Sequence, residues 1–137
     1  KISYDSFINC INEKIKKKLE PFNLKEIYAD ILKRSNNYED INLEIENLIK
    51  NYHDNNTTLN ENELMILKNI YECVKGVLTF DEFIKSLEEK ELSFKKTGKI
   101  FRNIIVNFHS KLPIDSIIKF FGIQKVIDMI SHTINNE

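Results

Sequence analysis

Residues 97–134 read TGKIFRNIIVNFHSKLPIDSIIKFFGIQKVIDMISHTI, and this stretch indicates the fold most clearly. Its apolar residues recur at intervals of three and four, which is the spacing of an amphipathic α-helix. Pro113 suits the first position of a helix, and Gly122 suits a helix end. The stretch therefore predicts three helices, from about 98 to 109, from Pro113 to Gly122, and from 123 to 134. The apolar stripe of the first of these is Ile100, Phe101, Ile104, Ile105 and Phe108.

The same periodicity extends toward the N-terminus, where it predicts five more helices. Pro21 follows the first of them, Gly76 ends the fourth, and Thr79 with Glu82 forms a capping-box pair at the start of the fifth. No segment alternates as a β-strand does, so the sequence predicts an all-α fold, an irregular bundle of about eight helices. The five apolar stripes run through residues 7–15, 24–32, 41–52, 64–74 and 83–87.

A chain of 137 residues, 42% of them apolar, is long enough to bury the core of a single domain, residues 1–137. Its longest predicted loop is the polar stretch 52–62, YHDNNTTLNEN, which divides the domain into two helical halves, 1–53 and 61–137. The chain has no apolar run of transmembrane length and no signal-peptide pattern at its N-terminus. We therefore expect a cytoplasmic protein without a membrane partner.

Charge is distributed unevenly along the chain. Residues 95–137 contain seven lysines and arginines against three acids, whereas residues 1–94 contain 13 bases and 18 acids. Between Lys95 and Lys111 there are five bases and no acid. A local basic face of this kind suits the binding of a phosphate backbone, and the overall net charge of −1 conceals it.

The sequence lacks the residue patterns of a catalytic, cofactor or metal site. There is no glycine-rich phosphate loop, and the histidines at 53, 109 and 132 are too dispersed for a zinc-binding helix. Cys10 and Cys73 lie far apart outside any CxxC motif, which argues against a disulfide framework or a zinc ribbon. The many carboxylates, such as those of Glu88, Glu89 and Glu91, fall at positions predicted to lie on the surface of a helix. We therefore expect that this chain catalyses nothing by itself and holds no cofactor.

Three short pieces of the C-terminal region occur in a characteristic order: Gly98-Lys99-Ile100-Phe101, then Ser110-Lys111-Leu112-Pro113, then Phe120-Phe121-Gly122. In this order and spacing they resemble the C-terminal signature of bacterial glutamyl-tRNA synthetases, which are class I glutamate–tRNA ligases. Residues 13–27 and 64–89 are similar to earlier segments of the same family region. The resemblance extends over residues 5–134.

The resemblance implies an α-helix cage that receives the anticodon arm of tRNA(Glu). It also implies that the chain is a fragment, the anticodon-binding domain of a larger enzyme whose catalytic body attaches glutamate to tRNA with ATP and magnesium. That body, with its His-x-Gly-His and Lys-Met-Ser-Lys-Ser motifs, is absent from these residues. The expected partners are the tRNA and the catalytic body, and we expect a monomer.

The family pattern also points to the residues that would contact RNA. It places Ile105 where an arginine is usual, so we hypothesise that Arg102, three residues earlier and one turn away, substitutes for that arginine. Arginine and lysine hold the backbone, while unstacked anticodon bases are read by stacking and by hydrogen bonds. We expect Lys99, Arg102, Asn103 and His109 to form an outer row. The candidate RNA-binding residues are Lys95, Lys96, Lys99, Arg102, Asn103, His109, Ser110, Lys111 and Pro113.

Two other functions fit parts of the same pattern. An amphipathic bundle of modest overall charge is also typical of a small helical protein-interaction module that does not bind RNA. A DNA-binding helix-turn-helix would use the pair of helices in 113–134. Those helices carry few outward Arg, Asn or Gln side chains, and the basic run precedes them, so this alternative is disfavoured.

Overall fold

The computed structural model describes residues 2–55 and 57–136, and over these residues the chain is all-α, as the sequence predicts. The described part forms nine α-helices and one short 3-10 helix, η1, and contains no strand. The helices are α1 (Tyr4–Asn9), α2 (Glu13–Lys18), η1 (Leu24–Glu26), α3 (Tyr28–Lys33), α4 (Tyr38–His53), α5 (Glu61–Val74), α6 (Phe80–Glu89), α7 (Phe94–Val106), α8 (Ile114–Phe121) and α9 (Ile123–Asn135).

The first predicted helix is broken into α1 and α2, which corrects the sequence-based prediction of one helix before Pro21. The break lies at residues 10–12, where Asn42 of α4 bonds to both sides of it. The backbone N–H of Asn12 donates to Asn42 Oδ1 at 2.8 Å, and Asn42 Nδ2 donates to the Cys10 carbonyl at 3.0 Å. The spacing of apolar residues carries no information about this contact, because Asn42 lies 30 residues further along the chain.

Helix α7 begins at Phe94, four residues before the predicted start near Gly98, and ends at Val106 rather than near His109. Its early start buries aromatic surface, since the Phe94 ring lies 5.3 Å from that of Phe101 and 6.5 Å from that of Phe83 in α6. Its early end follows from Asn107, which takes the left-handed conformation with φ 47°. Asparagine tolerates this conformation and commonly stops helices in it.

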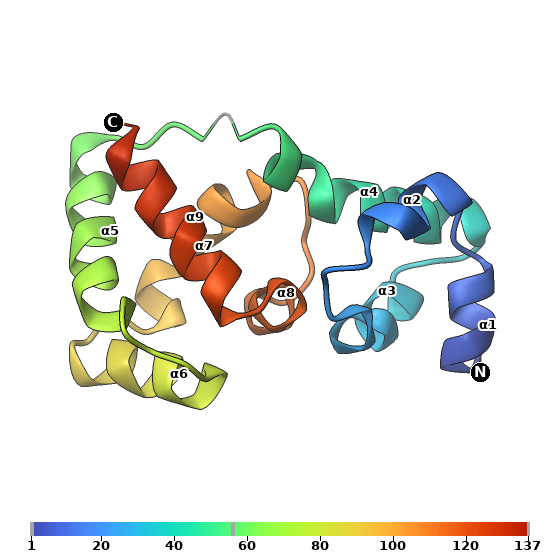
Figure 1. The fold of residues 1–137 in the computed structure, drawn as a ribbon, viewed down its shortest axis with the longest axis horizontal. Coiled ribbons are helices and arrows are strands. Elements are labelled where there is room, and N and C mark those ends of the chain that lie inside the picture. Colours follow the sequence, from blue (N-terminus) through green and yellow to red (C-terminus); the bar gives the residue numbers. More distant parts are fainter. Residues whose placement is uncertain (1, 56, 137) are drawn as a thin grey trace.

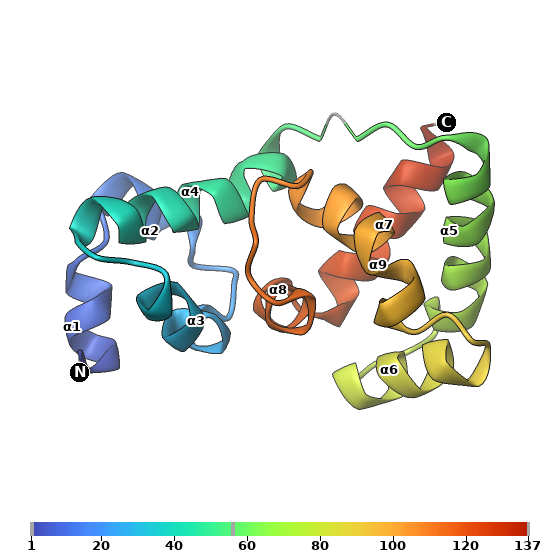
Figure 2. The ribbon, with the colours of Figure 1, turned by 180° about the vertical axis from the view of Figure 1, so that it is seen from behind.

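The two halves separated by the loop after α4 pack against each other. In Figure 1, α1–α4 gather on one side, α5, α6, α7 and α9 gather on the other, and α8 lies between the two groups. Helix α4 packs on α7, and η1 packs on α8. On the second side, α5 packs against α6 and α9, and α9 also contacts α7 and α8. Helix α7 lies behind α9 in Figure 1 and in front of it in Figure 2.

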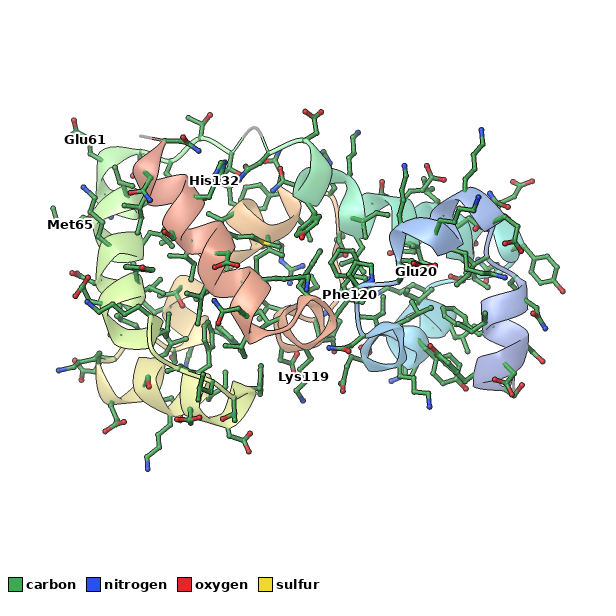
Figure 3. All side chains as sticks on the ribbon, viewed as in Figure 1. Glu20, Glu61, Met65, Lys119, Phe120 and His132 are labelled. Atoms are coloured by element: carbon green, nitrogen blue, oxygen red, sulfur yellow. The ribbon has the colours of Figure 1, made fainter. Side chains whose placement is uncertain are left out.

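An aromatic cluster joins the two halves. The ring of Phe22, in the segment between α2 and η1, lies 5.0 Å from the rings of both Phe120 and Phe121, and 5.1 Å from that of Tyr52. The backbone N–H of Asn23 donates to the Phe120 carbonyl at 2.8 Å. Figure 3 shows Phe120 at this junction. The buried apolar side chains of both halves therefore belong to one continuous core.

Within the described residues, no helix combines the length and the apolar character that crossing a bilayer requires.

Candidate nucleic-acid interface

The basic run is displayed on α7 and on the turn that follows it. Lys95, Lys99 and Arg102 occur at intervals of four and three, so they lie in one row along the helix. Lys95, Lys96 and Lys99 are exposed, and Arg102 is half-buried. The opposite side of α7 packs into the core. The buried apolar residues of α7 are Ile100, Phe101, Ile104, Ile105 and Val106.

The start of α7 carries an unusual charge. Its first turn contains Lys95 and Lys96 and no acid, and its N-cap residue Ser93 makes no side-chain capping bond. Helices α4, α5 and α6 each begin with two acids in the first turn. The N-terminus of a helix has a partial positive charge, so lysines there are unfavourable and acids are favourable. The positive charge at this end of α7 therefore opposes folding rather than assisting it.

None of the exposed lysines of this run is neutralised within the described residues. The ion pairs found there are Lys16–Glu13 in α2 and Lys75–Glu72 at the end of α5, and neither involves a residue of α7. Lys95, Lys96, Lys99 and Lys111 thus present free ammonium groups to solvent. Such groups are available to a polyanion.

Arg102 holds the turn between α7 and α8 in place. Its Nη1 donates to the Ser110 carbonyl at 2.8 Å and to the Leu112 carbonyl at 2.9 Å. Burial lowers the pKa of Arg102, and the positive charge of Arg34 at the end of α3 lowers it further. Arg34 therefore lies close enough to add to the positive field around this turn, although nothing in the sequence connects it with α7.

Two of the candidate residues face inward, which corrects the predicted outer row and candidate surface. Asn103 is 7% exposed, and its Nδ2 donates to the Thr58 carbonyl at 3.2 Å. Ser110 is 1% exposed, and its Oγ accepts a hydrogen bond from the Leu112 N–H at 3.3 Å. Both side chains bond to backbone groups of the fold: Asn103 to the Thr58 carbonyl before α5, and Ser110 to the Leu112 N–H in the turn after α7. They are therefore buried and do not belong to the exposed face of α7.

The C-terminal carbonyls of α7 are satisfied by residues outside the helix. Asn51 of α4 donates through Nδ2 to the Ile104 carbonyl at 3.0 Å and to the Ile105 carbonyl at 3.3 Å. The Thr57 hydroxyl donates to the Asn103 carbonyl at 3.3 Å. A helix end leaves several carbonyls without intrahelical partners, so these bonds fix where α7 stops and where the following turn begins.

The turn at 107–113 places four candidate or neighbouring side chains in solvent: those of Phe108, His109, Lys111 and Pro113. The sequence-based prediction put Phe108 in the inner apolar stripe, and that prediction is wrong. Because α7 ends at Val106, Phe108 leaves the helical register, and it is 53% exposed. The signal that could have found it is the preceding Asn107, a residue type that often ends helices.

The structure thus brings Lys95, Lys96, Lys99, His109, Lys111 and Pro113 to the surface of α7 and its following turn, with Arg102 at their junction. Among the described residues, no group of His, Cys, Asp and Glu is arranged to hold a metal ion. Comparison of the chain with family models, curated proteins and solved structures finds no match in any of the three.

Proposed function

We propose that this chain binds RNA through the exposed face of α7 and the turn 107–113, and that its ligand is the anticodon arm of tRNA(Glu). The observation that carries the proposal is the set of exposed, unpaired lysines at the start of α7, Lys95, Lys96 and Lys99, which Lys111 continues along the chain with no acid between. Cations spaced along one helix suit the regularly spaced phosphates of a nucleic-acid backbone.

The unfavourable charge at the start of α7 supports the proposal. Lys95 and Lys96 oppose the helix dipole and form no ion pair within the described residues, so their charges weaken the start of α7. Positive charge at a site where it costs stability is expected when a ligand requires it.

The tRNA is favoured among RNAs by the resemblance of residues 98–101, 110–113 and 120–122 to glutamyl-tRNA synthetases. On this proposal the chain is the anticodon-binding domain of a glutamate–tRNA ligase, and ATP, magnesium and the transfer of glutamate belong to the catalytic body. The half-buried Arg102 stands one turn from Ile105, where the family has its arginine. It supports the turn, while its remaining guanidinium nitrogens stay available to a phosphate or a base edge.

The decisive experiment is a titration of the isotopically labelled chain with an anticodon stem-loop that carries the glutamate anticodon. We expect chemical-shift changes at 95–99 and 108–111 that weaken as salt is raised. A stem-loop of equal length with an unrelated anticodon serves as the control for sequence reading. Absence of any shift with either RNA, even at low salt, would refute RNA binding. Equal shifts with both would keep RNA binding and refute the specificity for tRNA(Glu).

A matched pair of charge reversals separates this surface from general electrostatics. Lys95→Glu with Lys96→Glu should weaken binding and reduce the slope of log K against log salt by about 0.7 for each lost phosphate contact in a single strand. Lys68→Glu with Lys85→Glu changes the net charge equally at exposed positions on α5 and α6. If both pairs weaken binding equally, the proposed surface is wrong.

One surface favours the alternative of a protein-interaction module. A groove between α3 and the start of α4 is lined largely by apolar side chains, and Tyr38 at its rim is 66% exposed. A partner helix could place apolar residues there. This function would be favoured if the labelled chain showed no chemical-shift changes with either RNA but showed changes centred on residues 28–41 when a protein partner is added. The apolar residues that line the groove are Ile2, Tyr28, Ala29, Leu32, Tyr38 and Ile41.

A further inference from the structure

Phe108 differs from every other phenylalanine of the chain. The sequence has nine, and the structure describes all of them. Eight are buried or half-buried, whereas Phe108 is 53% exposed. The acid-free run from Lys95 to Lys111 contains two phenylalanines, and Phe101 is fully buried, so Phe108 is the exposed one of the two. A flat apolar ring exposed at a basic surface suits the stacking of a flat aromatic ligand that carries phosphates.

The backbone at Phe108 is strained. Its φ is 61°, and that of Asn107 before it is 47°, so two consecutive residues without glycine lie in the left-handed region. Asparagine tolerates this region, but a bulky aromatic residue does not adopt it readily. Strain of this kind persists only where the surroundings impose it, and it is common at ligand-binding sites.

The surroundings of Phe108 do impose its position. Asn107 N–H donates to the Asn103 carbonyl at 2.9 Å, and His109 N–H donates to the Val106 carbonyl at 2.9 Å, one on each side of it. Further along the turn, Arg102 holds the carbonyls of Ser110 and Leu112. The ring is therefore presented on a fixed turn at the end of α7.

We propose that the Phe108 ring is a stacking platform for an unpaired base of the bound RNA. The inference rests on the proposed RNA binding and deepens it, because it assigns the single-stranded part of the ligand to the turn and its phosphates to the lysines of α7. Unstacked bases stack readily on aromatic side chains, and this contact tolerates any base. His109 and Lys111 lie beside the ring in the sequence and are exposed, so a base there would have its phosphates near positive or polar groups.

The absence of tryptophan from the chain allows a direct spectroscopic test. Phe108→Trp introduces a single indole at the proposed platform, and stacking of a base on it should quench its fluorescence when the anticodon stem-loop is added. The control is Leu78→Trp, a position that is 82% exposed between α5 and α6. We expect strong quenching at 108 and little at 78. Equal quenching at both positions, or none at 108 under conditions where RNA shifts are observed, would overturn the inference.

Binding measurements on side-chain variants provide the second test. Phe108→Ala should weaken stem-loop binding by about fivefold to 150-fold, the range expected for one lost base–aromatic stack. Phe108→Tyr keeps the ring and should retain most of the affinity, whereas Phe108→Leu keeps apolar bulk without the ring and should not. If Leu binds as tightly as the wild type, the contact is simple apolar packing and the stacking inference fails.

Thermal stability separates this role from a structural one. Phe108→Asn places a residue that tolerates the left-handed region at the strained position, so its Tm should equal or exceed that of the wild type while its RNA affinity falls. A lower Tm would indicate that Phe108 serves the fold. RNA binding that is unchanged by Phe108→Asn overturns the stacking inference alone, whereas failure of the wild type to bind RNA overturns the proposed function as well.

Discussion

Arg102 illustrates how one side chain can serve both the fold and a ligand. Its guanidinium spans two backbone carbonyls of the turn, and hydrogen bonds from charged groups are stronger than those from neutral ones. The guanidinium is also half-buried, so leaving its charge without hydrogen-bond partners would cost free energy of folding. This positioning role is independent of whether the remaining nitrogens also reach a ligand.

We expect Arg102→Ala to lower the free energy of unfolding by about 1–3 kcal/mol, because two carbonyls lose their donor. The helix content should be unchanged, and stem-loop affinity should fall roughly tenfold or more as the turn loses its support. Urea unfolding and the RNA titration measure the two effects. Because arginine stays protonated near neutral pH even when burial lowers its pKa, the stability contribution of Arg102 should not vary between about pH 5 and 8.

Lys111→Ala is the matched control for Arg102. It removes a nearby positive charge that forms no ion pair within the described part of the chain. It should weaken RNA binding while leaving the free energy of unfolding within about 0.5 kcal/mol of that of the wild type. If Arg102→Ala behaves as Lys111→Ala does, the two hydrogen bonds contribute nothing to stability.

Among the elements, α7 is the helix in which stability and the proposed function conflict. Replacing Lys95 and Lys96 by glutamate puts acids in its first turn, where the dipole favours them by about 0.3–1 kcal/mol each. We therefore expect the double variant to unfold at higher urea concentration than the wild type, although it binds RNA less well. A variant that loses both stability and binding would indicate that the lysines support the fold.

The start of α5 provides a test of capping within the same chain. Asn60 Oδ1 accepts the Glu63 N–H at 2.8 Å, and Glu63 Oε1 accepts the Asn60 N–H at 3.0 Å, which completes a capping box. Asn60→Ala should cost about 1 kcal/mol of stability. Asn12 occupies the same position at α2 but makes no side-chain capping bond, so Asn12→Ala should cost less. Equal losses in urea unfolding would contradict this account of the two caps.

At the scale of the whole molecule, the aromatic cluster around Phe22 makes the two halves interdependent. Its ring contacts Phe120 and Phe121 of α8 and Tyr52 of α4, so it connects segments from both sides of the loop at 54–60. Phe22→Ala should lower the free energy of unfolding by about 3–5 kcal/mol. Leu78→Ala, at an exposed position, should change it by less than about 0.5 kcal/mol.

The continuous core also predicts how the chain unfolds. Circular dichroism and the fluorescence of the Phe108→Trp variant should report one coincident transition, because the halves share a core. A fragment of residues 57–137 would leave Phe120 and Phe121, which are buried in the chain, without the ring of Phe22 that covers them. We expect that fragment not to unfold cooperatively. Two separate transitions in the full chain would contradict this view and favour independent halves.

The all-α class, and the positions of α5, α8 and α9, follow from the spacing of apolar residues along the chain. Ile117, Ile118 and Ile130 are buried as that spacing predicts, because amphipathic periodicity is a local property that survives folding. Thr79 caps α6, as predicted, by accepting the Glu82 N–H at 3.2 Å, since capping also depends on neighbours in the sequence. The predicted capping box is only half formed, because Glu82 Oε1 accepts the Thr79 hydroxyl at 3.1 Å in place of the Thr79 backbone N–H.

Features that depend on residues far apart in the sequence cannot be predicted from such patterns. The break between α1 and α2 depends on Asn42, and the inward turn of Asn103 depends on the Thr58 carbonyl 45 residues away. The exposure of Phe108 depends on where α7 stops. Asn107 is a local signal for that end, whereas the bonds from Asn51 of α4 to the last carbonyls of α7 are not visible in the sequence pattern. Polar side chains satisfy backbone groups wherever the packed chain brings them together. Tertiary contacts therefore decided these features. The spacing of apolar residues along the chain contains no information about which distant backbone groups a polar side chain will meet.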